Sequence, residues 1–225
     1  MGDNTLIVES VKKSYDNKCV LQDIYLKADI GDIVGLLGRN GSGKSTLLKI
    51  IFGTLEAESK FIQVGGKVYE NAYKSKDTIS LLPQDDFLPK HLKVGGIIDI
   101  YFGRGKARIT ANDKTVEKIL NTKIKNLSGG ELRYLEVKLL ANLNAKYLLL
   151  DEPFNGVSPI MIGDLKKIIL ESASTKGIIL SDHNYRSVLS VANKIYVLKD
   201  GHIKNIEDKR ELIRYGYIPD EAVNG

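Results

Sequence analysis

Cysteine is almost absent from this chain, since Cys19 is the only one among 225 residues. A single thiol excludes an internal disulfide framework, and it cannot by itself supply a cysteine-based zinc site. So little cysteine is typical of proteins in a reducing compartment. We therefore expect a protein that works in the cytoplasm.

Long hydrophobic runs are also missing. No window approaches the roughly 18 consecutive apolar residues that a membrane-spanning helix needs. Residues 1–6 lack the basic and then apolar pattern of a secretory signal, and Leu6 stands where a myristoylation motif requires Ser or Thr. Any association with a membrane is therefore expected to pass through a partner protein.

Positive charge is modest and scattered. The formal net charge is +5, and Lys and Arg do not gather in one block. Proteins that bind nucleic acid usually concentrate basic residues on one face or segment, so we expect no nucleic-acid partner. A composition that is 43% hydrophobic and 27% charged is that of an ordinary folded domain.

Two kinds of β structure are predicted. Residues 5–11 and 19–28 are β-prone runs around the turn pair Asp16-Asn17, which indicates an antiparallel layer. From residue 33 onward, short apolar runs alternate with helical patterns, which indicates a parallel sheet covered on both faces. The expected strands are 33–37, 61–68, 78–82, 147–150, 177–180, 194–198 and 203–206, and the expected helices are 45–52, 131–143, 160–172, 185–191 and 208–215.

A glycine-punctuated segment interrupts this alternation. Residues 85–126 carry short helical patterns near 97–102 and 111–120, which predict a small helical insert. Near the other end, Asp200-Gly201 is a tight-turn signal that closes a hairpin. No internal repeat occurs, so we expect one domain over residues 1–225.

The segment after the strand at 33–37 has a phosphate-binding pattern. It reads Gly38-Arg39-Asn40-Gly41-Ser42-Gly43-Lys44-Ser45-Thr46, a glycine followed after four residues by Gly-Lys-Ser. Glycines let backbone amides converge on an anion at a helix N-terminus. Lys44 is expected to hold the outer phosphates and Ser45 to bind magnesium. The alternative is a glycine-rich turn without a ligand, and the flanking strand and helix count against it.

Two carboxylates end the apolar strand at 147–150. Asp151 suits magnesium, and Glu152 beside it is placed to orient and deprotonate an attacking water. An acidic pair at a strand end is commonly just the polar start of a loop. Its position downstream of a phosphate loop favours a function.

A further segment, Leu127-Ser128-Gly129-Gly130-Glu131, opens a predicted helix. Ser128 and Glu131 have the spacing of a capping box, which gives them a structural explanation. The two glycines remain unexplained, because each costs about 1 kcal/mol against alanine in a helix interior. Bare amides at a helix start are what a phosphate needs.

Residues 38–46, 127–131 and 147–153, in this order, resemble those of an ABC-type ATPase, and the resemblance covers essentially the whole chain. It implies the α/β fold of a P-loop NTPase, with a mostly parallel sheet flanked by helices, an N-terminal antiparallel β subdomain and a small helical subdomain. It also implies Mg²⁺-dependent hydrolysis of ATP. Residues 127–131 match the family signature, which binds ATP held by a second copy or a homologous subunit, so that two chains sandwich two nucleotides.

The resemblance assigns roles to three more side chains. Tyr15 matches the aromatic that stacks on adenine, Gln84 the glutamine that contacts magnesium and senses a membrane subunit, and His183 the switch histidine near the γ-phosphate. Taken alone, each has a simpler explanation. Tyr15 is one of 11 tyrosines, and a loop glutamine or histidine is usually plain surface. Their order and spacing support the three roles together.

Finer features are similar to the lipopolysaccharide-export and branched-chain amino-acid uptake ATPases, namely Glu131 where many members carry Gln, and residues 151–157 and 181–184. Ser158 departs from the family, which usually has an Asp there that helps to couple the two sites. Phe87 and Leu88 are candidates for contact with a membrane subunit, and the alternative is packing within the insert.

The resemblance implies the motor of a transporter, peripheral on the cytoplasmic face of a membrane through integral membrane subunits. Two alternatives stay open. One is a soluble ABC ATPase for iron–sulfur assembly or another non-transport role, since such ATPases also carry a Ser-Gly-Gly-Glu signature. The other is a nucleotide-binding scaffold with little turnover, although Lys44, Asp151, Glu152 and His183 are all present.

Overall fold

The computed structural model describes residues 4–16, 18–103, 113–208 and 210–214, and it contains two sheets. The antiparallel sheet has the strand order β2-β1-β4-β5 and is built from β1 (Thr5–Tyr15), β2 (Lys18–Asp29), β4 (Ser59–Val64) and β5 (Lys67–Val68). The larger sheet has the order β10-β9-β3-β8-β7-β6 and is built from β3 (Ile33–Leu37), β6 (Ile79–Leu82), β7 (Tyr147–Asp151), β8 (Gly177–Ser181), β9 (Lys194–Lys199) and β10 (His202–Ile206).

The larger sheet is parallel except for β10, which pairs antiparallel with β9 at one edge. Every residue of β3, β7 and β8 is buried, which explains why these strands are continuous apolar runs in the sequence. Because the three strands are parallel neighbours, their carboxyl ends meet at one edge of the sheet. The segments that follow them therefore lie close together.

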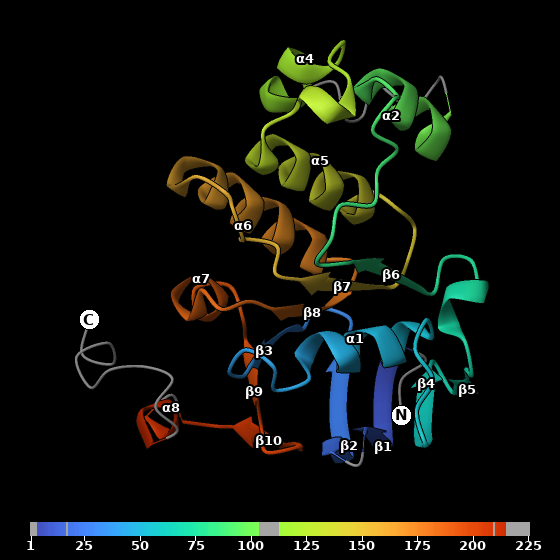
Figure 1. The fold of residues 1–225 in the computed structure, drawn as a ribbon, viewed down its shortest axis with the longest axis vertical. Helices are drawn as coiled ribbons and strands as arrows, with labels where there is room; N and C mark the ends of the chain where they lie inside the picture. Colours follow the sequence, from blue (N-terminus) through green and yellow to red (C-terminus); the bar gives the residue numbers. More distant parts are fainter. Residues whose placement is uncertain (1–3, 17, 104–112, 209, 215–225) are drawn as a thin grey trace.

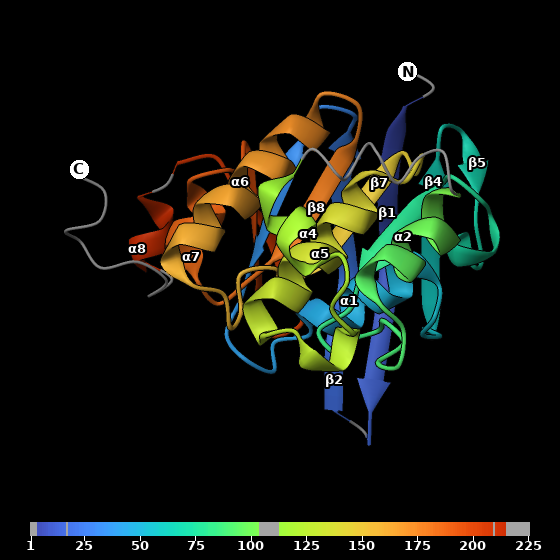
Figure 2. The same ribbon diagram turned by 90° about the horizontal axis from the view of Figure 1, so that it is seen from above.

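Helices cover both faces of this sheet. Helix α1 (Lys44–Phe52) lies between the two sheets, and α5 (Gly129–Ala141), α6 (Pro159–Ala173) and α7 (Tyr185–Leu189) lie on the opposite side (Figures 1 and 2). The alternation of β7 shows the same division, since Leu148 packs in the core with α5 and α6, whereas Leu149 packs in the core with α1. The α/β architecture predicted from the sequence is thus observed.

The segment between β6 and α5 is helical. It contains α2 (Val94–Phe102), α4 (Lys114–Ile119) and a 3₁₀ helix at Ile124–Asn126, and Figure 1 shows α2 and α4 at the end of the molecule away from the antiparallel sheet. Helix α2 begins three residues before the predicted pattern. Of the pattern predicted at 111–120, residues 111 and 112 lie outside the described residues.

Two-residue turns with positive φ join two hairpins. The turn Asp200-Gly201 between β9 and β10 is confirmed, with φ of 51° and 80°. The single strand predicted at 61–68 is wrong, because Gly65 and Gly66 adopt φ of 57° and 80° and reverse the chain between β4 and β5. Positive φ at both central residues is the geometry that two-residue hairpins require.

The C-terminal helix predicted at 208–215 is shorter in the structure, where α8 spans Glu211–Arg214. Residue 215 and those after it lie outside the described residues. A second 3₁₀ helix occupies Ala72–Lys74. No helix within the described parts of the chain is long and apolar enough to cross a membrane.

Candidate active site

The phosphate-binding pattern forms the connection from β3 to α1. Gly43 caps α1 with φ of 105°, and a Cβ atom added to it would lie 2.8 Å from Cγ1 of Val20 on β2. A Cβ added to Gly38 would lie 2.8 Å from the carbonyl oxygen of Leu198 on β9. Only glycine therefore permits this close packing, which brings bare backbone amides to the start of a helix.

Lys44, the first residue of α1, is a buried cation with 6% of its surface exposed. Its Nζ donates hydrogen bonds to the carbonyl oxygens of Gly38 at 2.8 Å and Arg39 at 3.2 Å. Burial lowers the pKa of Lys44, and the negative charges of Glu152, Asp151 and Asp182 act in the opposite direction. The ammonium thus balances charge between the loop and the acidic ends of β7 and β8.

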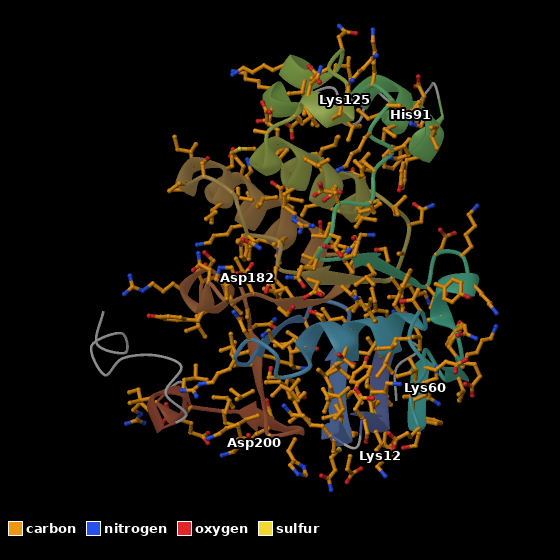
Figure 3. The ribbon with its side chains drawn as sticks, viewed as in Figure 1. Lys12, Lys60, His91, Lys125, Asp182 and Asp200 are labelled. Atoms are coloured by element: carbon orange, nitrogen blue, oxygen red, sulfur yellow. The ribbon has the colours of Figure 1, made fainter. Side chains whose placement is uncertain are left out.

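Two of these carboxylates are buried and hydrogen-bonded. Asp151 is 1% exposed, and its Oδ1 accepts a hydrogen bond of 2.7 Å from the Ser181 hydroxyl. Asp182, which is labelled in Figure 3, accepts hydrogen bonds from the backbone amides of Phe154 and Asn184. Asp182 was not predicted from the sequence, although its place directly after an apolar strand is the same signal that identified Asp151.

Glu152 lies where three loops meet. Its φ is 52°, an uncommon conformation for a residue other than glycine, and its amide donates to the carbonyl of Ser181 at 2.7 Å. Its Oε2 accepts hydrogen bonds from the side-chain amides of Asn155 at 3.2 Å and Gln84 at 3.4 Å, and its Oε1 lies 3.9 Å from Nδ1 of His183. The structure therefore brings the predicted base together with the predicted glutamine and histidine.

These groups line one groove of about 670 Å³, a size typical of small-molecule sites. Tyr15 lies in it, with 44% of its surface exposed and its ring 5.0 Å from Nζ of Lys13. Asn155 also lines the groove and was not predicted. The lining residues are Tyr15, Val20, Asn40, Gly41, Gly43, Lys44, Ser45, Thr46, Gln84, Glu152, Asn155 and His183.

The segment Ser128-Gly129-Gly130-Glu131 is not part of this groove, although the structure describes all four residues. The predicted capping box is present, with the Glu131 amide 3.3 Å from the Ser128 hydroxyl oxygen and the Ser128 amide 2.9 Å from a Glu131 carboxylate oxygen. Ser128 and Gly129 are exposed, and a Cβ added to Gly129 would meet no atom within 4 Å. The start of α5 therefore lies on the surface of the chain at Ser128 and Gly129.

The predicted magnesium ligands are the hydroxyl of Ser45, the amide of Gln84 and the carboxylate of Asp151. Oxygen donors suit Mg²⁺, which usually takes one or two carboxylates and completes its shell with phosphate oxygens and water. Among the described residues, no three His, Cys, Asp or Glu side chains gather as a metal site. The buried hydroxyl oxygen of Ser42 in the loop has no hydrogen-bond partner in the described structure, which is unusual for a buried polar atom. The donor set fits a magnesium–phosphate ligand.

Comparison with known proteins decides the family. A family model described as ABC transporter matches residues 21–155, more than half of the chain. The chain belongs to the ABC transporter family. The lipopolysaccharide export system ATP-binding protein LptB of Escherichia coli (strain K12) is 30% identical over 223 residues, with 88% of each chain covered. The protein of the same name from Haemophilus influenzae is 31% identical over 222 residues, with the same coverage.

Solved structures of ABC ATP-binding cassettes have the same fold as this chain. An ATP-binding subunit of an ABC transporter superposes with a TM-score of 0.81 at 22% identity and covers 94% of this chain and 93% of its own. A nucleotide-free ATP-binding cassette gives a TM-score of 0.77 at 23% identity, with 98% of both chains covered. The predicted ABC-type ATPase fold is thus confirmed, as is the similarity to lipopolysaccharide-export ATPases. The chain is an ATP-binding subunit of the ABC transporter type, and its family consists of ATPases.

A buried ion pair on α5 contacts the segment that carries Gln84. Arg133 and Glu136 lie 3.3 Å apart, and Oε1 of Glu136 accepts a hydrogen bond of 3.1 Å from the amide of Phe87. Leu88 is 3% exposed and packs in the core, so the packing alternative holds for it, while Phe87 is half-buried. Neither Arg133 nor Glu136 was predicted to matter, because charged residues on a helix usually indicate its solvent face.

Glu136 makes stability depend on pH. Burial raises the pKa of Glu136 from 4.5 to about 7, against the opposing effects of the Phe87 amide and Arg133. Between these values the folded chain holds a proton that the unfolded chain has released, so the free energy of unfolding falls as pH rises. The side chain of Glu136→Gln does not titrate. Relative to wild type, we expect this variant to gain up to about 3 kcal/mol between pH ~4.5 and ~7.5.

Urea unfolding at a series of pH values measures this difference. Glu171→Gln on the neighbouring α6 is the control, because Glu171 is exposed and pairs only with Lys167 at 4.0 Å among the ion pairs of the described residues. It should follow the wild-type curve. Parallel curves for Glu136→Gln and wild type would show that Glu136 is ionised across the whole range.

Proposed function

We propose that this chain is the Mg²⁺-dependent ATPase motor of an ABC transporter and works as a head-to-tail pair with two ATP molecules between the copies. One observation carries the proposal. The phosphate loop, Gln84, Glu152 and His183 converge on one groove, whereas the signature residues Ser128 and Gly129 are exposed outside it. The helix start of one copy would complete the binding site of a phosphate that lies in the groove of the other.

Within one copy, different groups bind different parts of the ATP molecule. The amides of residues 41–45 and the Lys44 ammonium bind the phosphate chain, with Gly38, Arg39, Asn40 and Thr46 shaping the loop around it. Ser45, Gln84 and Asp151 hold Mg²⁺, which when bound neutralises charge on the phosphates. Tyr15, which lines the groove, stacks on adenine.

Glu152 accepts the proton of the attacking water as a general base. The side-chain amide of Asn155 donates a hydrogen bond to the Glu152 carboxylate. Nδ1 of His183 lies 3.9 Å from the same carboxylate, and His183 orients the γ-phosphate and the water. Across the pair, Ser128, Gly129, Gly130 and Glu131 of the second copy close the γ-phosphate cage. Their helix start supplies backbone amides and the positive end of the α5 dipole.

We further propose that the chain is a single domain over residues 1–225 with its helical insert at about 85–126, placed on the cytoplasmic face of a membrane by integral membrane subunits. The relatives named for lipopolysaccharide export support a transport role. The second member of the pair is another copy or a homologous subunit. Phe87, half-buried directly after the Gln84 loop, is the candidate contact with a membrane subunit.

Glu152→Gln tests the base. The amide keeps the size of the side chain but cannot accept the proton, so we expect ATP to bind as in wild type while hydrolysis falls by at least about 100-fold. An ATP-bound dimer should accumulate and be visible by size-exclusion chromatography. Glu171→Gln, an exposed carboxylate on α6, is the matched control and should hydrolyse normally. Normal turnover by a monomeric Glu152→Gln variant would show that the base is assigned wrongly.

Tyr15→Ala tests adenine recognition. Loss of a stacked base costs about 1–3 kcal/mol, so ATP should bind about tenfold or more weakly, whereas tripolyphosphate, which has no base, should bind as before. Isothermal titration with both ligands measures the difference. Tyr25→Ala removes a tyrosine of similar exposure, 52%, from outside the groove and should change neither affinity. Equal losses for the two ligands in Tyr15→Ala would contradict stacking.

A further inference from the structure

The loop that carries Gln84 is held by α5 through hydrogen bonds to its backbone. Arg133 donates from Nη1 to the carbonyl of Pro83 at 2.9 Å and from Nη2 to the carbonyl of Gln84 at 2.6 Å. Three residues beyond Gln84 in the loop, Glu136 accepts from the amide of Phe87 at 3.1 Å. Figure 1 shows the connection from β6 to α2 running beside α5, where these contacts form.

These contacts are made by two buried charged side chains. Arg133 is 6% exposed and Glu136 is 0% exposed, and the two side chains also bond to each other at 3.3 Å. The guanidinium fork fixes the directions of its donors, so two adjacent carbonyls held by one fork have little freedom to rotate. Buried carbonyls and charges are costly to leave unpaired, which makes the arrangement stiff.

The held backbone positions a side chain of the active site. Gln84 itself is exposed, and its amide reaches the Glu152 carboxylate only through a long hydrogen bond of 3.4 Å. Such a bond does not fix the loop, so the orientation of the Gln84 side chain depends on its backbone. Arg133 binds the carbonyl of that same residue.

We propose that Arg133 and Glu136 are positioning residues for ATP hydrolysis, a clamp that holds the backbone at 83–87 so that Gln84 reaches Glu152. This inference rests on the proposed function. The clamp also connects Gln84 to the start of α5. Arg133 and Glu136 lie one to two turns along α5 from Ser128 and Gly129, which the second copy's nucleotide would contact. A single helix thus joins the nucleotide of one groove to the glutamine of the other.

Arg133→Met should lower kcat by about tenfold to 100-fold, the usual effect of displacing a positioned group, while KM for ATP and the affinity for ADP change little. Among the described hydrogen bonds, Arg133 makes none to the phosphate loop or to Tyr15, so most of the ground-state binding does not depend on it. Lys138→Met is the matched control. Lys138 is on the same helix and pairs at 3.0 Å with Asp113 rather than with the loop, so its kcat should stay at the wild-type value.

Breaking a buried pair can also unfold a protein, so a second variant separates positioning from stability. Arg133→Met combined with Glu136→Leu removes both charges and leaves none unpaired, which restores stability in many proteins. We expect its melting temperature to recover toward wild type while kcat remains low. Recovery of kcat together with the melting temperature would show that the pair only supports the fold, and would overturn the proposal.

A fluorescence measurement tests the clamp without relying on activity. The chain has no tryptophan, so Phe87→Trp places a single reporter on the clamped loop. In this background, Arg133→Met should increase acrylamide quenching and shift the emission to the red, whereas Lys138→Met should not. Unchanged fluorescence with Arg133→Met would overturn the clamp even if ATP is hydrolysed. Absence of hydrolysis in wild type would instead contradict the proposed function.

Discussion

The buried ammonium of Lys44 is the charge on which the rest of the site depends. It lies at the start of α1 with 6% of its surface exposed, it bonds to two loop carbonyls, and three carboxylates stabilise its positive charge. A buried cation is costly unless it is hydrogen-bonded and paired with negative charge. The parallel sheet supplies these partners, because β3 leads into the loop, β8 beside it is followed by Asp182, and β7 on the other side of β8 ends in Asp151. The strand order therefore brings the Lys44 ammonium together with these carboxylates.

Helix α5 connects this site to the exterior of the chain. Its first turn is exposed at Ser128 and Gly129, whereas nine of its residues are buried between the sheet and the helical segment. Arg133 and Glu136 are among those nine, and they bond to the loop that carries Gln84. An element that is exposed at its start and packed along its length can transmit contact with a second molecule to the groove.

Local patterns predicted the parts of this structure that depend on neighbouring residues. The connection from β3 into α1, the capping box at Ser128 and the turn Asp200-Gly201 were predicted correctly, because each is determined within a few residues. The strand predicted at 61–68 failed because β-prone residues lie on both sides of Gly65-Gly66, where the chain reverses. Here the turn chemistry overrides the β propensity of the flanking residues.

Contacts between distant segments could not be predicted in the same way. Arg133 and Glu136 bond to residues 83–87, nearly 50 positions away, and a charged pair on a helix gives no sign of such burial. Asp182 is similar, because its effect on Lys44 depends on the neighbouring positions of β3 and β8. The convergence of Gln84, Asn155 and His183 on Glu152 also arises from the strand order rather than from any one motif.

In the proposed pair, the helix start of one copy touches the nucleotide in the groove of the other. This contact can be tested by trapping ADP with vanadate in place of the γ-phosphate and then cleaving the backbone beside the vanadate with ultraviolet light. We predict cuts at two places in the chain, within residues 38–46 and at Ser128. Cleavage confined to residues 38–46 in a fully trapped sample would contradict the shared site.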